Sequence, residues 1–146
     1  AAHLKRVYQS DVGKQLNKML EDQMGIKALA WPYIGTRHLN LKPKKKIMTP
    51  ADMAGIKLRM PPGDGWQFVG TALGANPSPV AFTEVYTALQ TGVVDGLEQE
   101  ASIVLAGKFY EIAKYCALTR HIYNSSIPVI SQRPSALNRA DRMPDR

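Results

Sequence analysis

The sequence predicts an α/β domain, and three neighbouring segments carry this prediction. Residues 56–60 alternate apolar with basic side chains and are followed by two prolines, which is typical of a strand with two different faces. Residues 64–73 place apolar side chains at helical spacing and are followed by a glycine. Residues 75–82 are held extended by prolines. A strand, a helix and a return to the sheet form the βαβ unit of an α/β fold.

Before this unit the chain predicts one longer helix, one strand and one short helix. Residues 10–23 carry apolar side chains on one helical face, with Ser10 as the N-cap and a glycine as the terminator. Residues 26–34 are apolar but interrupted by a proline, which indicates a strand that is not central throughout. Residues 49–52 form a helix start in which threonine caps, proline takes the first helical position and aspartate reaches back.

After the βαβ unit the chain predicts further short elements. We expect a helix over 83–90, a strand over 93–94 closed by a turn at Asp95 and Gly96, a helix-like stretch over 108–113, and strands over 115–119 and 127–130. Residues 132–146 have little apolar periodicity and carry four arginines, so we expect a disordered tail.

The composition is that of a soluble globular protein. The 146 residues are 45% apolar and 21% charged, with a formal net charge of +7. The basic residues cluster at 42–46 and after 132, without the interleaved aromatics that a surface for single-stranded nucleic acid requires. We therefore expect no nucleic-acid partner, and a basic nucleic-acid-binding domain is kept as an alternative.

Cysteine use and hydropathy add two limits. Cys116 is the single cysteine, so no intrachain disulfide can form, and its apolar neighbours indicate a buried position in a strand. No apolar run reaches the roughly 20 residues that span a bilayer. Residues 1–6 do not contain the apolar core of a signal peptide.

The sequence contains no recognisable motif for catalysis or metal binding. His3, His38 and His121 lie in different segments and lack metal-ligand spacing. The carboxylates that could supply acid–base chemistry are Glu84, Asp95, Glu98 and Glu100. We expect each of these to be a helix-start charge, a turn residue or solvated surface, so no catalytic residue, metal or cofactor is predicted. A small α/β enzyme without a recognisable motif is the second alternative.

Several motifs in the chain resemble one protein family, and they occur in the family's order. The motifs are GIKLRMP at 55–61, LGANPSPVAFTEVY at 73–86, ALQTGVVDG at 88–96, KFYE at 108–111 and TRH at 119–121. The sequence is similar, from about residue 4 to residue 131, to the DctP-type substrate-binding proteins of tripartite ATP-independent periplasmic (TRAP) transporters.

This resemblance implies a periplasmic-binding-protein-like (type II-like) α/β fold, in which two lobes close over a small organic acid. It implies a periplasmic protein, monomeric at full length, that delivers its ligand to the TRAP membrane permease and is not an enzyme. Residues 1–25 would then form the linker helix at the end of the first lobe. Residues 26–131 would form the second lobe with the ligand-anchoring arginine and the crossing strands, and residues 132–146 an atypical tail.

The length of the chain qualifies these expectations. Relatives of this kind are about twice as long, so we expect an incomplete first lobe without its opening strands and without an export signal. A truncated or frameshifted reading frame would produce the atypical tail. Because one lobe and a fraction cannot enclose a ligand, we expect weak binding at most.

The resemblance also assigns ligand-binding residues. Arg59 matches the family's main carboxylate-binding arginine, a role that suits a planar guanidinium because it offers two parallel donors to two carboxylate oxygens. Arg37, in Gly35-Thr36-Arg37, matches a second family arginine, with a surface charge as the alternative.

Three further residues complete the expected site. Phe82 matches an aromatic residue that walls the family's pocket, and otherwise belongs to the core. Gln99 stands where many relatives carry asparagine, and Leu97 replaces a polar residue. Both departures argue against a plain C4-dicarboxylate as the ligand. Trp66 either borders the pocket or packs its own helix.

Overall fold

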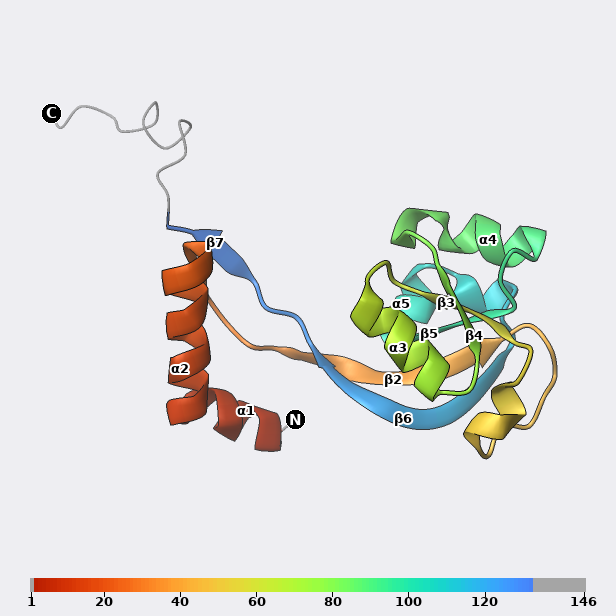
Figure 1. Cartoon of the computed structure of the whole chain (residues 1–146), viewed down its shortest axis with the longest axis horizontal. Helices are drawn as coiled ribbons and strands as arrows, with labels where there is room; N and C mark the ends of the chain where they lie inside the picture. The colour runs from red at the N-terminus through yellow and green to blue at the C-terminus, as the bar shows by residue number, and fades with distance from the viewer. Residues whose placement is uncertain (1, 133–146) are drawn as a thin grey trace, which may run out of the picture. The chain divides into compact units, whose positions relative to one another are not determined.

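The computed structural model describes residues 2–132, which divide into two compact units. Residues 35–124 form the first, here called the sheet unit. Residues 2–34 and 125–132 form the second, here called the helical unit. Figure 1 shows the chain coloured by residue number. The predicted disordered tail falls almost entirely outside the described residues.

The sheet unit is built on a mixed five-stranded sheet with the strand order β4-β3-β5-β2-β6. The central strand β5 (Gly96–Glu100) runs parallel to β3 (Lys57–Met60) and antiparallel to β2 (Tyr33–Leu41). The edge strands are β4 (Asn76–Pro79), parallel to β3, and β6 (Tyr115–Ser125). The prediction of an α/β fold is confirmed.

The predicted βαβ unit is present as β3, α3 (Asp64–Ala72) and β4. Gly74, two residues after the end of α3, terminates the helix with a φ of +82°, in the left-handed region that glycine tolerates best. Within α3, Gly70 faces β4 closely, since a Cβ there would lie 2.7 Å from the side chain of Pro77. Small residues therefore allow the helix to pack down on the parallel strands.

Short helices connect and cover the strands. They are η2 (Pro50–Met53), η3 (Phe82–Glu84), α4 (Val85–Thr91), α5 (Ala101–Ala106) and η4 (Phe109–Glu111). The predicted short helix after residue 49 and the helix after residue 83 are confirmed within a few residues. The predicted strand at 93–94 is wrong, because the strand begins at Gly96, where a turn was expected. Helix α5 was not predicted, and the helix expected over 108–113 is a single 3₁₀ turn.

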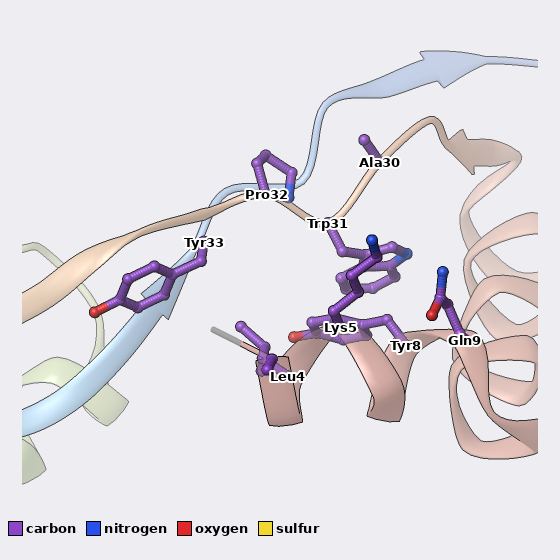
Figure 2. A pocket seen from close by; sticks show the side chains of 9 residues that line it. Leu4, Lys5, Tyr8, Gln9, Ala30, Trp31, Pro32 and Tyr33 are labelled. Atoms are coloured by element: carbon purple, nitrogen blue, oxygen red, sulfur yellow. The ribbon is translucent and has the colours of Figure 1, made fainter.

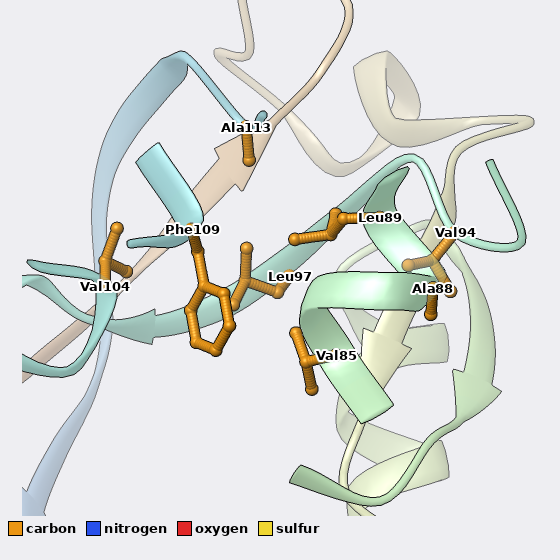
Figure 3. Close-up of a cluster of buried hydrophobic side chains, with 8 residues drawn as sticks. All are labelled: Val85, Ala88, Leu89, Val94, Leu97, Val104, Phe109 and Ala113. Atoms are coloured by element: carbon orange, nitrogen blue, oxygen red, sulfur yellow. The ribbon is translucent and has the colours of Figure 1, made fainter. Parts of the chain in front are cut away.

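Two apolar clusters cover the two faces of the sheet. One contains Val85, Ala88, Leu89, Val94, Leu97, Val104, Phe109 and Ala113, as Figure 3 shows. The other contains Leu39, Leu41, Met53, Ile56, Leu58, Met60 and Ala75. Strand β3 therefore lies between two apolar layers, and from Leu58 to Met60 its side chains are buried on both faces.

The helical unit contains two helices and a small two-stranded sheet. Helices α1 (Ala2–Gln9) and α2 (Asp11–Met19) are followed by a π-helical turn, η1 (Leu20–Met24). Strand β1 (Ile26–Ala28) pairs antiparallel with β7 (Val129–Ser131). Among residues 2–132 no helix is long and apolar enough to cross a membrane.

Some predictions for the helical unit need correction. The helix expected over 10–23 is α2 plus the π turn, and the strand expected over 26–34 is split into β1 and the start of β2. Ser10 occupies the N-cap position, but its hydroxyl donates to the carbonyl of Val7 rather than accepting from the helix. Gly25 ends the π turn with a φ of +63°, as expected for a terminating glycine.

The edge strand β6 differs from its prediction in length and burial. It extends to Ser125, well beyond the predicted end at residue 119. Cys116 is exposed, so the prediction of a buried thiol is wrong, because a strand at the edge of the sheet keeps part of its surface in solvent. Arg120 has a φ of +51°, and its backbone N–H donates to Nδ1 of His38 at 3.3 Å.

Candidate functional site

Arg37 lies at the centre of a buried polar network in the sheet unit. It is only 4% exposed. Its Nε and Nη2 donate to the two carboxylate oxygens of Glu98 at 2.5 and 2.6 Å, a bidentate ion pair. Nη2 also donates to Oε1 of Gln99 at 2.7 Å, and Nη1 lies 3.3 Å from Oε1 of Glu100. The alternative of a surface charge at Arg37 is therefore wrong.

The strand register explains why these residues meet. Arg37 on β2 is directly opposite Glu100 on β5, and side chains at directly opposed positions lie on the same face. Glu98 is two residues earlier on β5 and so shares that face. Both carboxylates are essentially without solvent exposure. The expectation that Glu98 and Glu100 are turn or surface charges is wrong.

Strand β6 adds two polar partners to the same network. The Nδ2 group of Asn124 donates to Oε1 of Glu100, and Nε2 of His121 lies 3.4 Å from Oε2 of Glu98. The remaining oxygen of Glu100, Oε2, has no hydrogen-bond partner among the residues described. The network therefore joins three neighbouring strands of the sheet.

Besides Arg37, two of the predicted site residues belong to this network. Gln99 is 8% exposed and receives a hydrogen bond from Arg37. Trp66 on α3 lies with its ring 4.9 Å from the guanidinium carbon of Arg37, a cation–π contact. Trp66 also packs against the apolar cluster that contains Leu58, so the expected helix packing is observed.

Arg59 is buried in a different way. It is opposite Leu97 in the register of β3 and β5, which places it on the other face of the sheet from Leu58. Its exposure is 3%, because α4, α5 and η4 cover that face. The alternation that predicted Arg59 on the opposite face to its apolar neighbours is confirmed. The alternative that Arg59 is an ordinary surface arginine is wrong.

The guanidinium of Arg59 has few partners. Its Nε donates to the carbonyl of Val80 at 2.9 Å, and no carboxylate of residues 2–132 forms an ion pair with it. Burial lowers the pKa of Arg59, Glu98 partly counteracts this effect, and the positive charge of Arg37 adds to it. Arg59 therefore keeps terminal N–H groups available, whereas each guanidinium nitrogen of Arg37 has an acceptor on β5.

Phe82 lies just after Val80, the residue whose carbonyl accepts the hydrogen bond from Arg59. It starts η3 two residues after Val80 and is 51% exposed. Its ring meets the ring of Phe109 edge-on at 5.9 Å. Phe82 is thus anchored on the apolar cluster of Figure 3 while half of it stays accessible to solvent.

Sequence reasoning missed part of this site. Glu98 and Glu100 were considered, and their i, i+2 spacing after Gly96 is a strand signal that could have placed them on one face. His121 was considered only as a metal ligand, and Asn124 carries no local signal at all. Residues 2–132 contain no group of three or more His, Cys, Asp or Glu side chains that could hold a metal ion.

A separate cavity lies in the helical unit. Figure 2 shows this cavity of about 550 Å³, which is lined mainly by apolar and aromatic side chains from α1 and from residues 30–33. The ring of Tyr8 stacks on Trp31 there, with centroids 4.0 Å apart. None of the predicted ligand-binding residues lines it.

Comparison with known proteins identifies the family. The sequence profile of the bacterial extracellular solute-binding proteins, family 7 (DctP), matches residues 1–134. This chain belongs to the DctP family. The resemblance that the sequence motifs indicated is therefore confirmed, and the α/β fold agrees with that of solved family members.

Individual DctP relatives bind different organic acids. A TRAP periplasmic solute-binding protein of Roseobacter denitrificans, solved with bound 3-deoxy-D-manno-oct-2-ulosonic acid (KDO), is 46% identical with a TM-score of 0.87 and is matched over 90% of this chain and 44% of its own. A succinate-bound protein of Sulfurospirillum deleyianum is 36% identical with a TM-score of 0.80, over 90% of this chain and 42% of its own.

A curated DctP relative is matched over a similar part of this chain. The sialic acid-binding periplasmic protein SiaP of Vibrio cholerae is 35% identical over 130 residues, which is 89% of this chain and 40% of that protein. The chain thus spans well under half the length of the relatives it matches.

Proposed function

We propose that this chain is the carboxylate-anchoring part of an extracytoplasmic solute-binding subunit of a TRAP transporter. In this proposal residues 26–131 form the second lobe, and Arg59 binds the carboxylate of a small organic acid. The protein acts in the periplasm by binding without turnover and passes its ligand to the membrane permease. Family membership and the organic acids bound by the relatives support this proposal.

The observation that carries the proposal is the contrast between the two buried arginines. A buried guanidinium without a carboxylate partner is costly, and a ligand carboxylate offers the missing charge and acceptors. Arg59 is buried and has no carboxylate partner among residues 2–132. Arg37 already forms a bidentate pair with Glu98, so its part in the proposed site is to hold Glu98 and Gln99 in place.

In this proposal Phe82 and Trp66 also contribute to the ligand-binding site. The half-exposed ring of Phe82 would cover apolar atoms of the acid, since the segment just before it is fixed to Arg59. Trp66 would act through Arg37, on whose guanidinium it packs.

The proposal is tested by titrating the ¹⁵N-labelled chain with KDO and following the Arg Nε–Hε signals. We expect weak, saturable binding that shifts the Arg59 signal. In Arg59→Gln two charge-assisted hydrogen bonds of about 1.5–3 kcal/mol each are lost, so KDO affinity should fall at least about a hundredfold. Arg6→Gln, an exposed arginine of α1, is the matched control and should bind as the parent does.

Two results would contradict the proposal. If Arg59→Gln bound KDO and succinate as the parent chain does, Arg59 would not be the anchor. If neither acid shifted any signal at millimolar concentration, the test moves to the full-length KDO-binding relative of Roseobacter denitrificans. There the arginine that matches Arg59 is replaced and KDO binding is measured. Undiminished binding by that variant would reject the assignment.

A further inference from the structure

The loop between β2 and η2, residues 42–49, presents a concentrated positive charge to solvent. Here it is called the lysine loop. Lys44, Lys45 and Lys46 are consecutive and exposed. None of the three forms an ion pair with any residue between 2 and 132. Lys45 has a long-range electrostatic interaction with Asp52, the smallest of the contributions that lower the pKa of that carboxyl. Most of the positive charge of the lysine loop is therefore open to an outside partner.

Two further lysines add to this charge. The Nζ groups of Lys42 and Lys57 donate to carbonyls at the C-terminal end of α4, at 2.7 and 2.6 Å. The nearby acids already accept from main-chain N–H groups. Asp52 accepts from the two residues before η2, and Asp95 accepts from the N–H of Lys57 at 2.9 Å. This end of the sheet thus carries five positively charged lysines and two negatively charged aspartates.

The shape of the lysine loop is fixed at its end. The carboxylate of Asp52 accepts from the backbone N–H groups of Met48 and Thr49 at 2.9 and 2.8 Å. These hydrogen bonds lower the pKa of Asp52. These bonds hold the end of the loop beside the crevice described next, which lowers the entropic cost of ordering the backbone there on binding.

An apolar crevice of about 110 Å³ adjoins the lysine loop. It is lined by Ile47, Met48, Pro50, Met53 and Leu73, together with Leu39, Thr49 and Thr119. Met48 is 72% exposed, so the crevice borders solvent. Pockets for free small ligands usually measure about 300–1,000 Å³. This crevice is therefore too small for such a ligand and of a size to take one aliphatic side chain.

The lysine loop lies at the opposite end of β2 and β5 from the arginine network. Leu41, which precedes it, is opposite Gly96 at the start of β5, whereas Arg37 is opposite Glu100 at its end. A partner on the lysine loop would therefore leave the region of Arg37 and Glu100 uncovered.

We propose that the lysine loop and its crevice form a docking site for an acidic polypeptide segment that carries one aliphatic side chain. Unpaired lysines complement acidic residues, and the crevice accepts the apolar side chain between them. A flat lipid surface would leave the crevice unused. A nucleic acid would find no aromatic side chain on residues 42–49 on which a base could stack.

The test uses fluorescence anisotropy of the full chain with a labelled seven-residue peptide that has leucine at its centre and three acidic residues on each side. We expect saturable binding that weakens with salt. The triple variant Lys44→Gln, Lys45→Gln, Lys46→Gln should weaken binding at least about tenfold, since three exposed ion pairs are lost. The peptide with alanine at its centre should bind at least about fivefold more weakly.

A matched control separates docking from general charge. Lys5→Gln, Lys14→Gln and Lys18→Gln remove the same charge from exposed positions of α1 and α2, and should change the affinity less than about twofold. Equal weakening by both triple variants would overturn the proposal, as would equal binding of the leucine and alanine peptides. Binding to phosphatidylglycerol vesicles without binding of the peptide would replace the peptide by a membrane and reject it.

Discussion

The sheet unit and the helical unit differ in how far their apolar side chains are buried. Every buried apolar residue that the structure describes lies between residues 39 and 113, in the sheet unit. In the helical unit Met19, Met24 and Leu29 are each more than half exposed, and Gly13 is the one described residue that is buried. The helical unit is held by the short pairing of β1 with β7 and by the stack of Tyr8 on Trp31.

This difference shows where the stability of the chain resides. Burial of apolar surface is the main favourable contribution to folding, so the free energy of unfolding should be concentrated in the sheet unit. Each unit contains one of the two tryptophans, Trp31 in the helical unit and Trp66 in the sheet unit. Replacement of Trp31 by phenylalanine therefore allows fluorescence to follow the sheet unit alone.

The largest contrast is expected for arginine substitutions. Arg37→Met leaves the buried carboxylate of Glu98 without its partner and should lower the free energy of unfolding by about 3–5 kcal/mol. Arg6→Met removes an exposed charge from the helical unit and should change it by less than about 0.5 kcal/mol. Urea unfolding measures both changes, that of Arg37→Met by the Trp66 fluorescence of the Trp31→Phe background and that of Arg6→Met by circular dichroism. The double variant Arg37→Met, Glu98→Met should recover part of the loss, and no recovery would argue against an unpaired carboxylate as the cause.

Leucine substitutions sharpen the same contrast. Leu97 is fully buried in the sheet unit, so Leu97→Ala should cost about 2–5 kcal/mol of unfolding free energy. Leu16 on α2 is 39% exposed, and Leu16→Ala should cost less than about 1 kcal/mol. Urea midpoints from circular dichroism provide the comparison. Similar losses at both positions would show that the helical unit is as tightly packed as the sheet unit.

A smaller contrast concerns acid sensitivity. Burial lowers the pKa of His38 from its usual value, with additional effects of Arg120 and His121. The unfolded chain then binds more protons than the folded one near this pKa. The contribution of His38 is complete above about pH 6.5 and is lost as the pH falls through the lower folded pKa.

Urea midpoints between pH 8 and pH 5 test this contribution. His38→Gln should reduce the loss of stability on acidification, because the group that binds the extra proton is gone. His3→Gln, at an exposed position of α1, is the control and should leave the pH dependence as it is. An unchanged slope in His38→Gln would contradict the assignment.

The part of the fold predicted from sequence is the part with strong local signals. The alternation at 56–60, the prolines that follow it and the helical spacing up to Leu73 identified β3, α3 and β4. Arg59 was placed on the correct face for the same reason. Its burial depends on α4, α5 and η4, which cover that face from later in the chain, so no local pattern could predict it.

Strand β5 shows why the rest could not be predicted. Its residues, Gly96 to Glu100, include a glycine, two glutamates and a glutamine, which are poor strand formers and usually exposed. Glu98 can be buried only because Arg37, 61 residues away in sequence, supplies the opposite charge. The predicted roles of Arg59, Arg37, Phe82, Gln99 and Trp66 in binding a ligand stay predictions.

The outer strand β4 of the sheet has a feature with a consequence for solubility. An outer strand with free N–H and C=O groups invites a strand of another molecule to add to it, which begins aggregation. On β4, Pro77 and Pro79 have no N–H to offer such a strand. The N–H groups of Asn76 and Val80 donate to Ile56 and Met60, so the N–H-lacking positions of Pro77 and Pro79 fall on the outward side. The β4 edge of the sheet thus resists addition of a strand from another molecule.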